Sequence, residues 1–194
     1  EWRQGVAVDG AGNFYLTTPF NGTASFGFTN ITSVGDRDIL VAKYNSKGDV
    51  VWVRQAGGIG VDGGRTIATD AAGNCYVAGI FSSTASFNGQ ALTSAGNWDV
   101  FLAKYDGGGT LLWVRSLGGP GQDDCLVVAT DAGGNCYLVG KFSGTASFGS
   151  TNLISAGDTD GFLAKFSGTG QCLWARRFGG TGHDDCQGLA LDGA

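Results

Sequence analysis

The sequence has little of several residue types that mark common classes of protein. Its 194 residues include no Met, 2 Pro and 1 His, and only 15% of them are charged. The net charge of −5, without any cluster of Lys and Arg, argues against nucleic acid or an anionic membrane surface as a partner. No apolar run approaches the roughly 20 residues that a membrane-spanning helix needs, so we expect no membrane insertion. The chain opens at Glu1 rather than Met, which we interpret as a processed or partial chain.

Glycine is abundant, and it belongs to a repeat. The 36 Gly residues occur without blocks of charge, which predicts tight turns rather than disorder. Asp9, Asp70, Asp131 and Asp192 are each 61 positions apart. The same register relates the columns Phe20/Phe81/Phe142, Lys43/Lys104/Lys165, Trp52/Trp113/Trp174 and Arg54/Arg115/Arg176. A fixed period of this size indicates a solenoid, a propeller or an array. We expect units at residues 1–63, 64–124 and 125–183, with the first strand of a further unit in 184–194.

Each unit is predicted to contain four short strands, a to d. Runs rich in β-branched and aromatic residues, bounded by Gly, Asn and Asp, predict them. The predicted ranges are 6–8, 66–69, 126–130 and 188–191 for strand a, 14–20, 75–81 and 136–142 for strand b, 39–44, 100–105 and 161–166 for strand c, and 50–54, 111–115 and 172–176 for strand d. Four antiparallel strands per repeated unit are typical of propeller blades. We therefore expect an all-β propeller, with a β-solenoid as the alternative, and we expect the Trp column to pack between neighbouring units.

The motifs of the second and third units resemble a known family. The second unit has Asp70 to Gly79, Asp99-Val-Phe-Leu-Ala-Lys104 and Gly118-Gly-Pro-Gly-Gln-Asp123, and the third repeats these motifs at 131–140, 160–165 and 179–184. This pattern resembles the bacterial β-propeller repeat called SBBP, although the first unit has Thr18 where the pattern has Gly. The resemblance implies a secreted or cell-surface protein, often with long repeat arrays, and no established catalytic activity.

Three blades are too few to close a propeller, which typically has four to eight. An open ring would leave strand edges uncovered. Either the chain belongs to a longer array or copies of it assemble, and two copies would give six blades. The expected partner is therefore the chain itself or further blades of the same array.

One face of such a propeller carries the candidate binding residues. The b–c and d–a links emerge together, opposite the tight a–b and c–d turns, and long loops on a rigid scaffold often carry function. The candidates on this face are Asp62, Asp123, Asp184 and Trp98, with Arg54, Arg115 and Arg176 expected nearby.

Three interpretations of these residues stay open. The aspartates could be structural, pairing with Arg or accepting hydrogen bonds from backbone N–H groups. They could bind Ca²⁺, because Gly-Gly-x-Gly-x-Asp resembles one turn of a calcium-binding β-helix repeat, but here it returns only every 61 residues. The face could also hold a glycan or protein ligand, with Trp98 as a platform, since its column otherwise contains Arg37 and Thr159.

The remaining reactive residues argue against an enzyme. The five cysteines, Cys75, Cys125, Cys136, Cys172 and Cys186, lack the spacing of a zinc site and are expected to be buried thiols. His183 is the single His, and its column holds Val61 and Gln122, so no catalytic arrangement and no metal site is assigned. The sequence predicts a non-catalytic structural or adhesive module that acts between chains or blades, and the resemblance implies that it belongs to an extracellular or cell-surface protein. The alternative is a lectin-like or calcium-dependent propeller that binds its ligand on the long-loop face.

Overall fold

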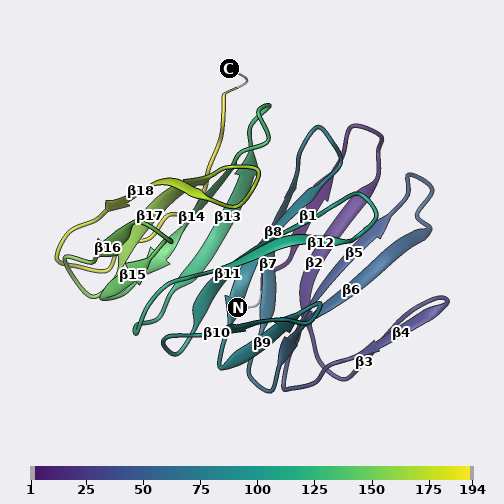
Figure 1. The fold of residues 1–194 in the computed structure, drawn as a ribbon, viewed down its shortest axis with the longest axis horizontal. Helices are drawn as coiled ribbons and strands as arrows, with labels where there is room; N and C mark the ends of the chain where they lie inside the picture. The colour runs from purple at the N-terminus through teal and green to yellow at the C-terminus, as the bar shows by residue number, and fades with distance from the viewer. Residues whose placement is uncertain (1–2, 193–194) are drawn as a thin grey trace.

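A computed structural model describes residues 3–192, and within them the chain forms antiparallel β-sheets and no helix (Figure 1). Unit 1 consists of β1 (Gly5–Val8), β2 (Phe14–Phe20), β3 (Thr23–Phe26), β4 (Thr29–Thr32), β5 (Asp38–Tyr44) and β6 (Val50–Gly58). Unit 2 consists of β7 (Gly63–Thr69), β8 (Cys75–Phe81), β9 (Thr84–Phe87), β10 (Gln90–Thr93), β11 (Asp99–Tyr105) and β12 (Leu111–Leu117). Unit 3 consists of β13 (Asp124–Thr130), β14 (Cys136–Phe142), β15 (Thr145–Ser147), β16 (Asn152–Ile154), β17 (Asp160–Phe166) and β18 (Cys172–Phe178).

The all-β, antiparallel prediction is confirmed. In each unit strands a to d pair in chain order, as β1-β2-β5-β6, β7-β8-β11-β12 and β13-β14-β17-β18. The a–b turns are tight because an aspartate organises each one. In unit 2 the Asp70 carboxylate accepts hydrogen bonds from the N–H groups of Ala72 and Asn74, and Gly73 adopts a φ of 77° that favours glycine.

The structure differs from the predicted strands in two places. Each b–c link, expected to be a loop, contains a further hairpin: β3–β4, β9–β10 or β15–β16. The predicted strand at 188–191 is wrong, because residues 184–192 form no strand. Each strand a that does form pairs with the strand b that follows it in the same unit.

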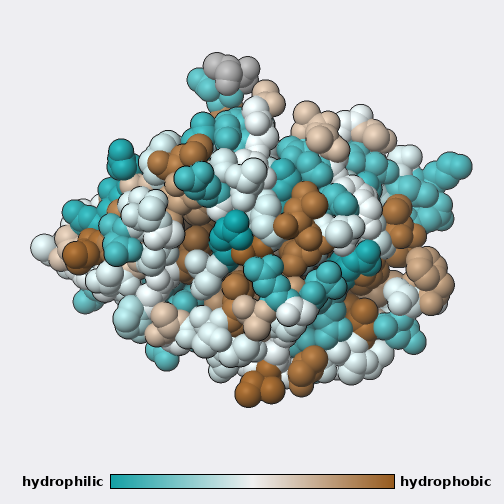
Figure 2. Space-filling view, in the orientation of Figure 1, coloured by the Kyte–Doolittle hydropathy of each residue, from teal (hydrophilic) through white to brown (hydrophobic). Residues whose placement is uncertain are grey.

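The core lies between neighbouring sheets. One buried cluster joins units 1 and 2 and includes Tyr15, Trp52 and Phe101. A second joins units 2 and 3 and includes Trp113 and Phe162. On the face seen in Figure 2, hydrophobic residues form small groups separated by polar ones. Each sheet therefore depends on its neighbour to bury its apolar side chains, as in other repeat folds.

Candidate functional site

The junction between units is built on the Trp column of strand d. Trp52 donates its indole N–H to the carbonyl of Gly107 in the next unit at 3.1 Å, and Trp113 donates to Gly168 at 3.0 Å. The two rings are only 5% and 8% exposed. This confirms the prediction that the Trp column packs between units, where a large ring supplies apolar contact and its N–H finds a partner.

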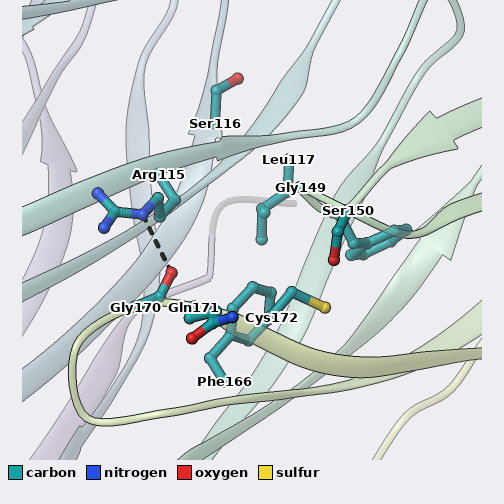
Figure 3. A pocket seen from close by; sticks show the side chains of 10 residues that line it. Arg115, Ser116, Leu117, Gly149, Ser150, Phe166, Gly170, Gln171 and Cys172 are labelled. Carbon is teal, nitrogen blue, oxygen red and sulfur yellow. Dashed lines mark hydrogen bonds between the residues drawn. The ribbon is translucent and has the colours of Figure 1, made fainter.

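The Arg column adds a second contact to the same turns. The Nε–H of Arg54 donates to Gly109 at 2.7 Å, and that of Arg115 donates to Gly170 at 3.0 Å (Figure 3). Each guanidinium also lies over the Trp ring two residues earlier in its own strand. These arginines therefore contact the tight c–d turns of the next unit, and the expectation that they lie beside the aspartates of the long-loop face is wrong for both.

Tyrosine and lysine side chains complete this set of contacts. The hydroxyl groups of Tyr15 and Tyr76 donate to carbonyls in the next a–b turn, those of Gly73 and Gly134, at 3.0 and 2.7 Å. Lys43 donates to the same Gly107 carbonyl that Trp52 uses, at 3.1 Å. The two junctions thus repeat one pattern, in which one unit supplies donors and the next supplies turn carbonyls.

The extra hairpins cross the junction in the opposite direction. Hairpin β9–β10 of unit 2 extends the sheet of unit 1, because β9 pairs with the end of β6. Glycine is needed there, since a Cβ on Gly58 would lie 2.0 Å from the Thr84 carbonyl oxygen. In unit 3, Ser147 and Gly118 exchange backbone hydrogen bonds of 3.0 and 2.8 Å. A Cβ on Gly119 would lie 1.8 Å from the Thr145 carbonyl oxygen.

At the two ends of the described chain, side chains are exposed whose counterparts are buried between units. At the end of unit 3, Trp174 is only half-buried and Phe178 is 39% exposed. At the end of unit 1, Val6 and Val8 are 65% and 53% exposed, whereas Ile67 in the Val6 column is 6% exposed. Hairpin β3–β4 pairs with no other sheet and projects from the right-hand end in Figure 1.

The three candidate aspartates of the long-loop face accept hydrogen bonds from their own links. The carboxylates of Asp62, Asp123 and Asp184 accept from the N–H groups four residues before them, each at 2.8 Å. Asp62 and Asp123 are almost fully buried and Asp184 is half-buried. This geometry matches the structural interpretation, in which the carboxylate holds a Gly-rich link in shape.

Burial also changes the acidity of two of these groups. Burial, the largest cause, raises the pKa of Asp123 to about 7, and nearby Asp99 adds to it, while the Gly119 N–H opposes the shift. Burial likewise raises the pKa of Asp62 to about 6, with a smaller contribution from Asp38. The long-loop face therefore holds two carboxyl groups that favour their neutral form more than an ordinary aspartate does.

Trp98 lines a cleft between units 2 and 3, and its backbone carbonyl accepts a hydrogen bond from the N–H of Asp123 at 2.9 Å. Its backbone forms a parallel bridge with Gln122, and the cleft of about 170 Å³ is also lined by Asp124, Lys141 and His183. The sequence singled out Trp98 and His183 separately, and the structure brings them together. It also adds Lys141, whose column contains Pro19 and Ile80, so the departure from the repeat pattern was the signal that could have found it.

Beside this cleft lies a buried ion pair. Arg65 and Asp124 are 2.7 Å apart, and their side chains are 10% and 14% exposed. A second cavity of about 320 Å³ is lined by these two residues together with Lys141 and Asp185. Charged groups therefore gather where units 2 and 3 meet on the long-loop face.

The remaining features of residues 3–192 concern metal sites, membrane-spanning helices and reactive thiols. Within that range, no three His, Cys, Asp or Glu side chains are grouped so as to hold a metal ion, and no helix could cross a membrane. All five cysteines are free; four are buried and Cys186 is half-buried, which confirms the expected buried thiols at those four positions. Burial raises the pKa of the Cys75 thiol to about 12, so this group stays protonated and unreactive at neutral pH.

Two relatives are similar to this chain, and no protein-family model matches it. The regulatory protein FlaEY of Caulobacter vibrioides is 28% identical over 200 residues, which cover 97% of this chain and 21% of that protein. The uncharacterized WD repeat-containing protein L264 of Acanthamoeba polyphaga mimivirus is 28% identical over 177 residues, which cover 81% of this chain and 13% of that protein. The chain thus spans about a fifth or less of the length of the curated relatives it matches.

Proposed function

We propose that the chain is a non-catalytic structural or adhesive repeat module, built of propeller blades of the SBBP type and acting through contacts between units. The observation that carries this proposal is the exposed end of unit 3. Trp174 is half-buried and Arg176 is exposed, whereas Trp52 and Arg54 donate hydrogen bonds to the c–d turn of unit 2. A half-buried Trp and an exposed Arg, whose counterparts Trp52 and Arg54 bind the next unit, are typical of an interaction surface.

The propeller assignment has support from the architecture and from a relative. Repeated four-stranded antiparallel sheets are the unit of a propeller, and WD repeats, named in one of the two relatives, form propeller blades. A secreted or cell-surface location follows only from the resemblance to SBBP repeats and belongs to the proposal.

Sedimentation velocity over a wide range of protein concentration tests the proposed contacts. The chain should associate, and a variant with Trp174→Ala and Arg176→Ala should associate at least tenfold more weakly, because truncated hot-spot residues cost about 1.4 kcal/mol or more. Leu173→Ala is the matched control, since Leu173 is 49% exposed and its counterparts Val51 and Leu112 are equally exposed in complete junctions. A wild-type chain that stays monomeric throughout would refute the proposal.

A second candidate function is the binding of a glycan or another small polar ligand in the Trp98 cleft. The observation that favours it is that three residues which depart from their repeat columns, Trp98, Lys141 and His183, line one cleft. An aromatic ring flanked by polar side chains suits the flat apolar face and hydroxyl groups of a sugar. A glycan array, followed by tryptophan fluorescence titration of wild type and Trp98→Ala with any hit, tests it. Equal binding by both proteins would count against this cleft.

A further inference from the structure

We infer that hairpin β3–β4 of one chain adds to the free end of β18 in a second copy, in the register that the chain already uses between its own units. This inference rests on the proposed function and specifies its geometry. Inside the chain, β9 pairs with the end of β6 as Ala56↔Phe87, Gly57↔Ser86 and Gly58↔Ala85. Shifting these pairs by the repeat gives the intermolecular register Phe178↔Phe26, Gly179↔Ser25 and Gly180↔Ala24.

The glycines at the end of unit 3 leave space that this hairpin would fill. A Cβ on Gly180 or Gly182 would meet nothing within 4 Å, so nothing in the described chain requires glycine there. Their counterparts in unit 2, Gly119 and Gly121, are crowded by backbone oxygens of unit 3 at 1.8 and 2.2 Å. Gly179 has a φ of 133°, close to the 137° of Gly118, so the end of β18 already has the backbone conformation of a filled junction.

The side chains at this end keep the shape of the surface. Phe178 occupies the column that contains Ala56 and Leu117 in the other units. Its larger ring fits because Gly161 has no side chain: a Cβ there would lie 2.0 Å from the ring. The column of Gly161 otherwise contains Ile39 and Val100, so a larger residue on β18 is matched by a smaller one on β17. Such volume exchange preserves packing at a repeated interface.

The end of unit 1 offers the matching acceptors. By the repeat, Trp174, Arg176 and Tyr137 should donate to the carbonyls of Ser46, Gly48 and Gly12 in a second copy. Gly12 and Gly48 have φ values of 77° and 88°, like the 77° and 81° of their counterparts Gly73 and Gly109. Both turns therefore hold the conformation that presents these carbonyls inside the chain.

A second copy is the occupant that this chain can itself provide. The free hairpin and the free strand lie at opposite ends of the molecule in Figure 1, so one chain cannot pair them with each other. Two copies joined head to tail form two equal junctions and a closed ring of six units, within the range of known propellers. Strand β1 already fills the position of strand a in the receiving copy, so residues 184–192 are not needed for the junction.

Disulfide trapping tests the register. Antiparallel pairs without mutual hydrogen bonds have Cα atoms about 4.5 Å apart, which a disulfide can span. A chain with Phe26→Cys and Phe178→Cys should form a disulfide-linked dimer under mild oxidation, identified by mass spectrometry of the linked peptides. The control is Phe28→Cys with Phe178→Cys, since Phe28 lies in the hairpin turn, is 78% exposed and has no partner in this register. A ladder of larger products would overturn the closed ring, and linkage of the control pair with equal yield would overturn the register.

A glycine variant gives a second readout without cysteine. Gly180→Val should leave the thermal unfolding of the isolated chain unchanged but weaken dimerisation by about tenfold or more, because the added side chain would occupy the space of the hairpin backbone. Gly10→Ala is the control, since Gly10 is equally open and its counterpart in unit 2 is Ala71. A dimer that tolerates Gly180→Val and does not crosslink through residues 26 and 178 would refute this register while leaving the proposed function intact. A chain that never dimerises would refute both.

Discussion

Neutralising Asp123 should change how the stability of this protein depends on pH. Its folded-state pKa of about 7 compares with about 3.9 for an aspartate in an unfolded chain. The folded state therefore binds more protons than the unfolded state between these values, and stability falls as pH rises. From pH 5 to pH 8 the loss is about 3 kcal/mol for Asp123 and about 1 kcal/mol for Asp62, whose pKa is about 6. The Asp123→Asn variant should lose the larger contribution, while the raised pKa values of Asp62, Asp99 and Asp124 keep part of the pH dependence.

Urea unfolding followed by tryptophan fluorescence at pH 5 and pH 8 measures this difference. Asp131→Asn is the matched control, because hydrogen bonds from Asn135 lower the pKa of Asp131 to about 2, and its contribution is lost only below that range. An NMR titration of the Asp123 carboxyl group in the wild-type chain checks the pKa directly. If the wild-type free energy of unfolding is the same at both pH values, or if Asp123→Asn keeps the full dependence, the argument from burial is refuted.

Three further predictions concern the junctions inside the chain. Trp113→Ala should lower the free energy of unfolding by about 3–5 kcal/mol, because the ring is 8% exposed between units 2 and 3, and denaturant titration measures the loss. Gly119→Ala should cost about 2 kcal/mol in the same assay, since its Cβ would meet a backbone oxygen at 1.8 Å; a neutral result would contradict the close approach. Arg65→Leu should cost about 3 kcal/mol by leaving Asp124 buried without its partner, and adding Asp124→Asn should recover much of that loss.

The long strands were predictable because two independent signals agree on them. The repeat sets where each unit begins, and β-branched and aromatic runs mark the strands within it, so strands b at 14–20, 75–81 and 136–142 were predicted to the residue. The prediction of a strand at 188–191 failed because it rested on the residues of that segment alone. This segment has the pattern of strand a, but a strand also needs a neighbour, and pairing is a property of the whole sheet rather than of one segment.

The b–c hairpins were missed although one carries a clear turn signal. Asn88 and Gly89 have φ values of 50° and 85°, as expected for an Asn-Gly hairpin turn, and they separate β9 from β10. The polar, Thr-rich strands on either side gave too little hydrophobic contrast to be separated from a loop.

The candidate site was only partly predictable for a different reason. Comparison of the repeat columns showed that Trp98 and His183 depart from the repeat, but it could not show that the two residues line the same cleft. Their meeting depends on the parallel bridges Trp98↔Gln122 and Thr159↔His183, which recur with the repeat. Column comparison shows which residues are equivalent, but it does not show which segments of a unit pair with one another.

Because both junctions in the described residues use the same donor columns and the same turn carbonyls, neighbouring units can replace one another in these contacts. A chain from which residues 64–124 were deleted would place Trp52 and Arg54 against the carbonyls of Gly168 and Gly170, which Trp113 and Arg115 now contact. Genetic recombination between neighbouring repeats removes or adds one whole period at a time. Such events would change the number of units while each surviving boundary keeps its hydrogen bonds, so an array of this kind can vary in length over evolution without a new interface having to arise.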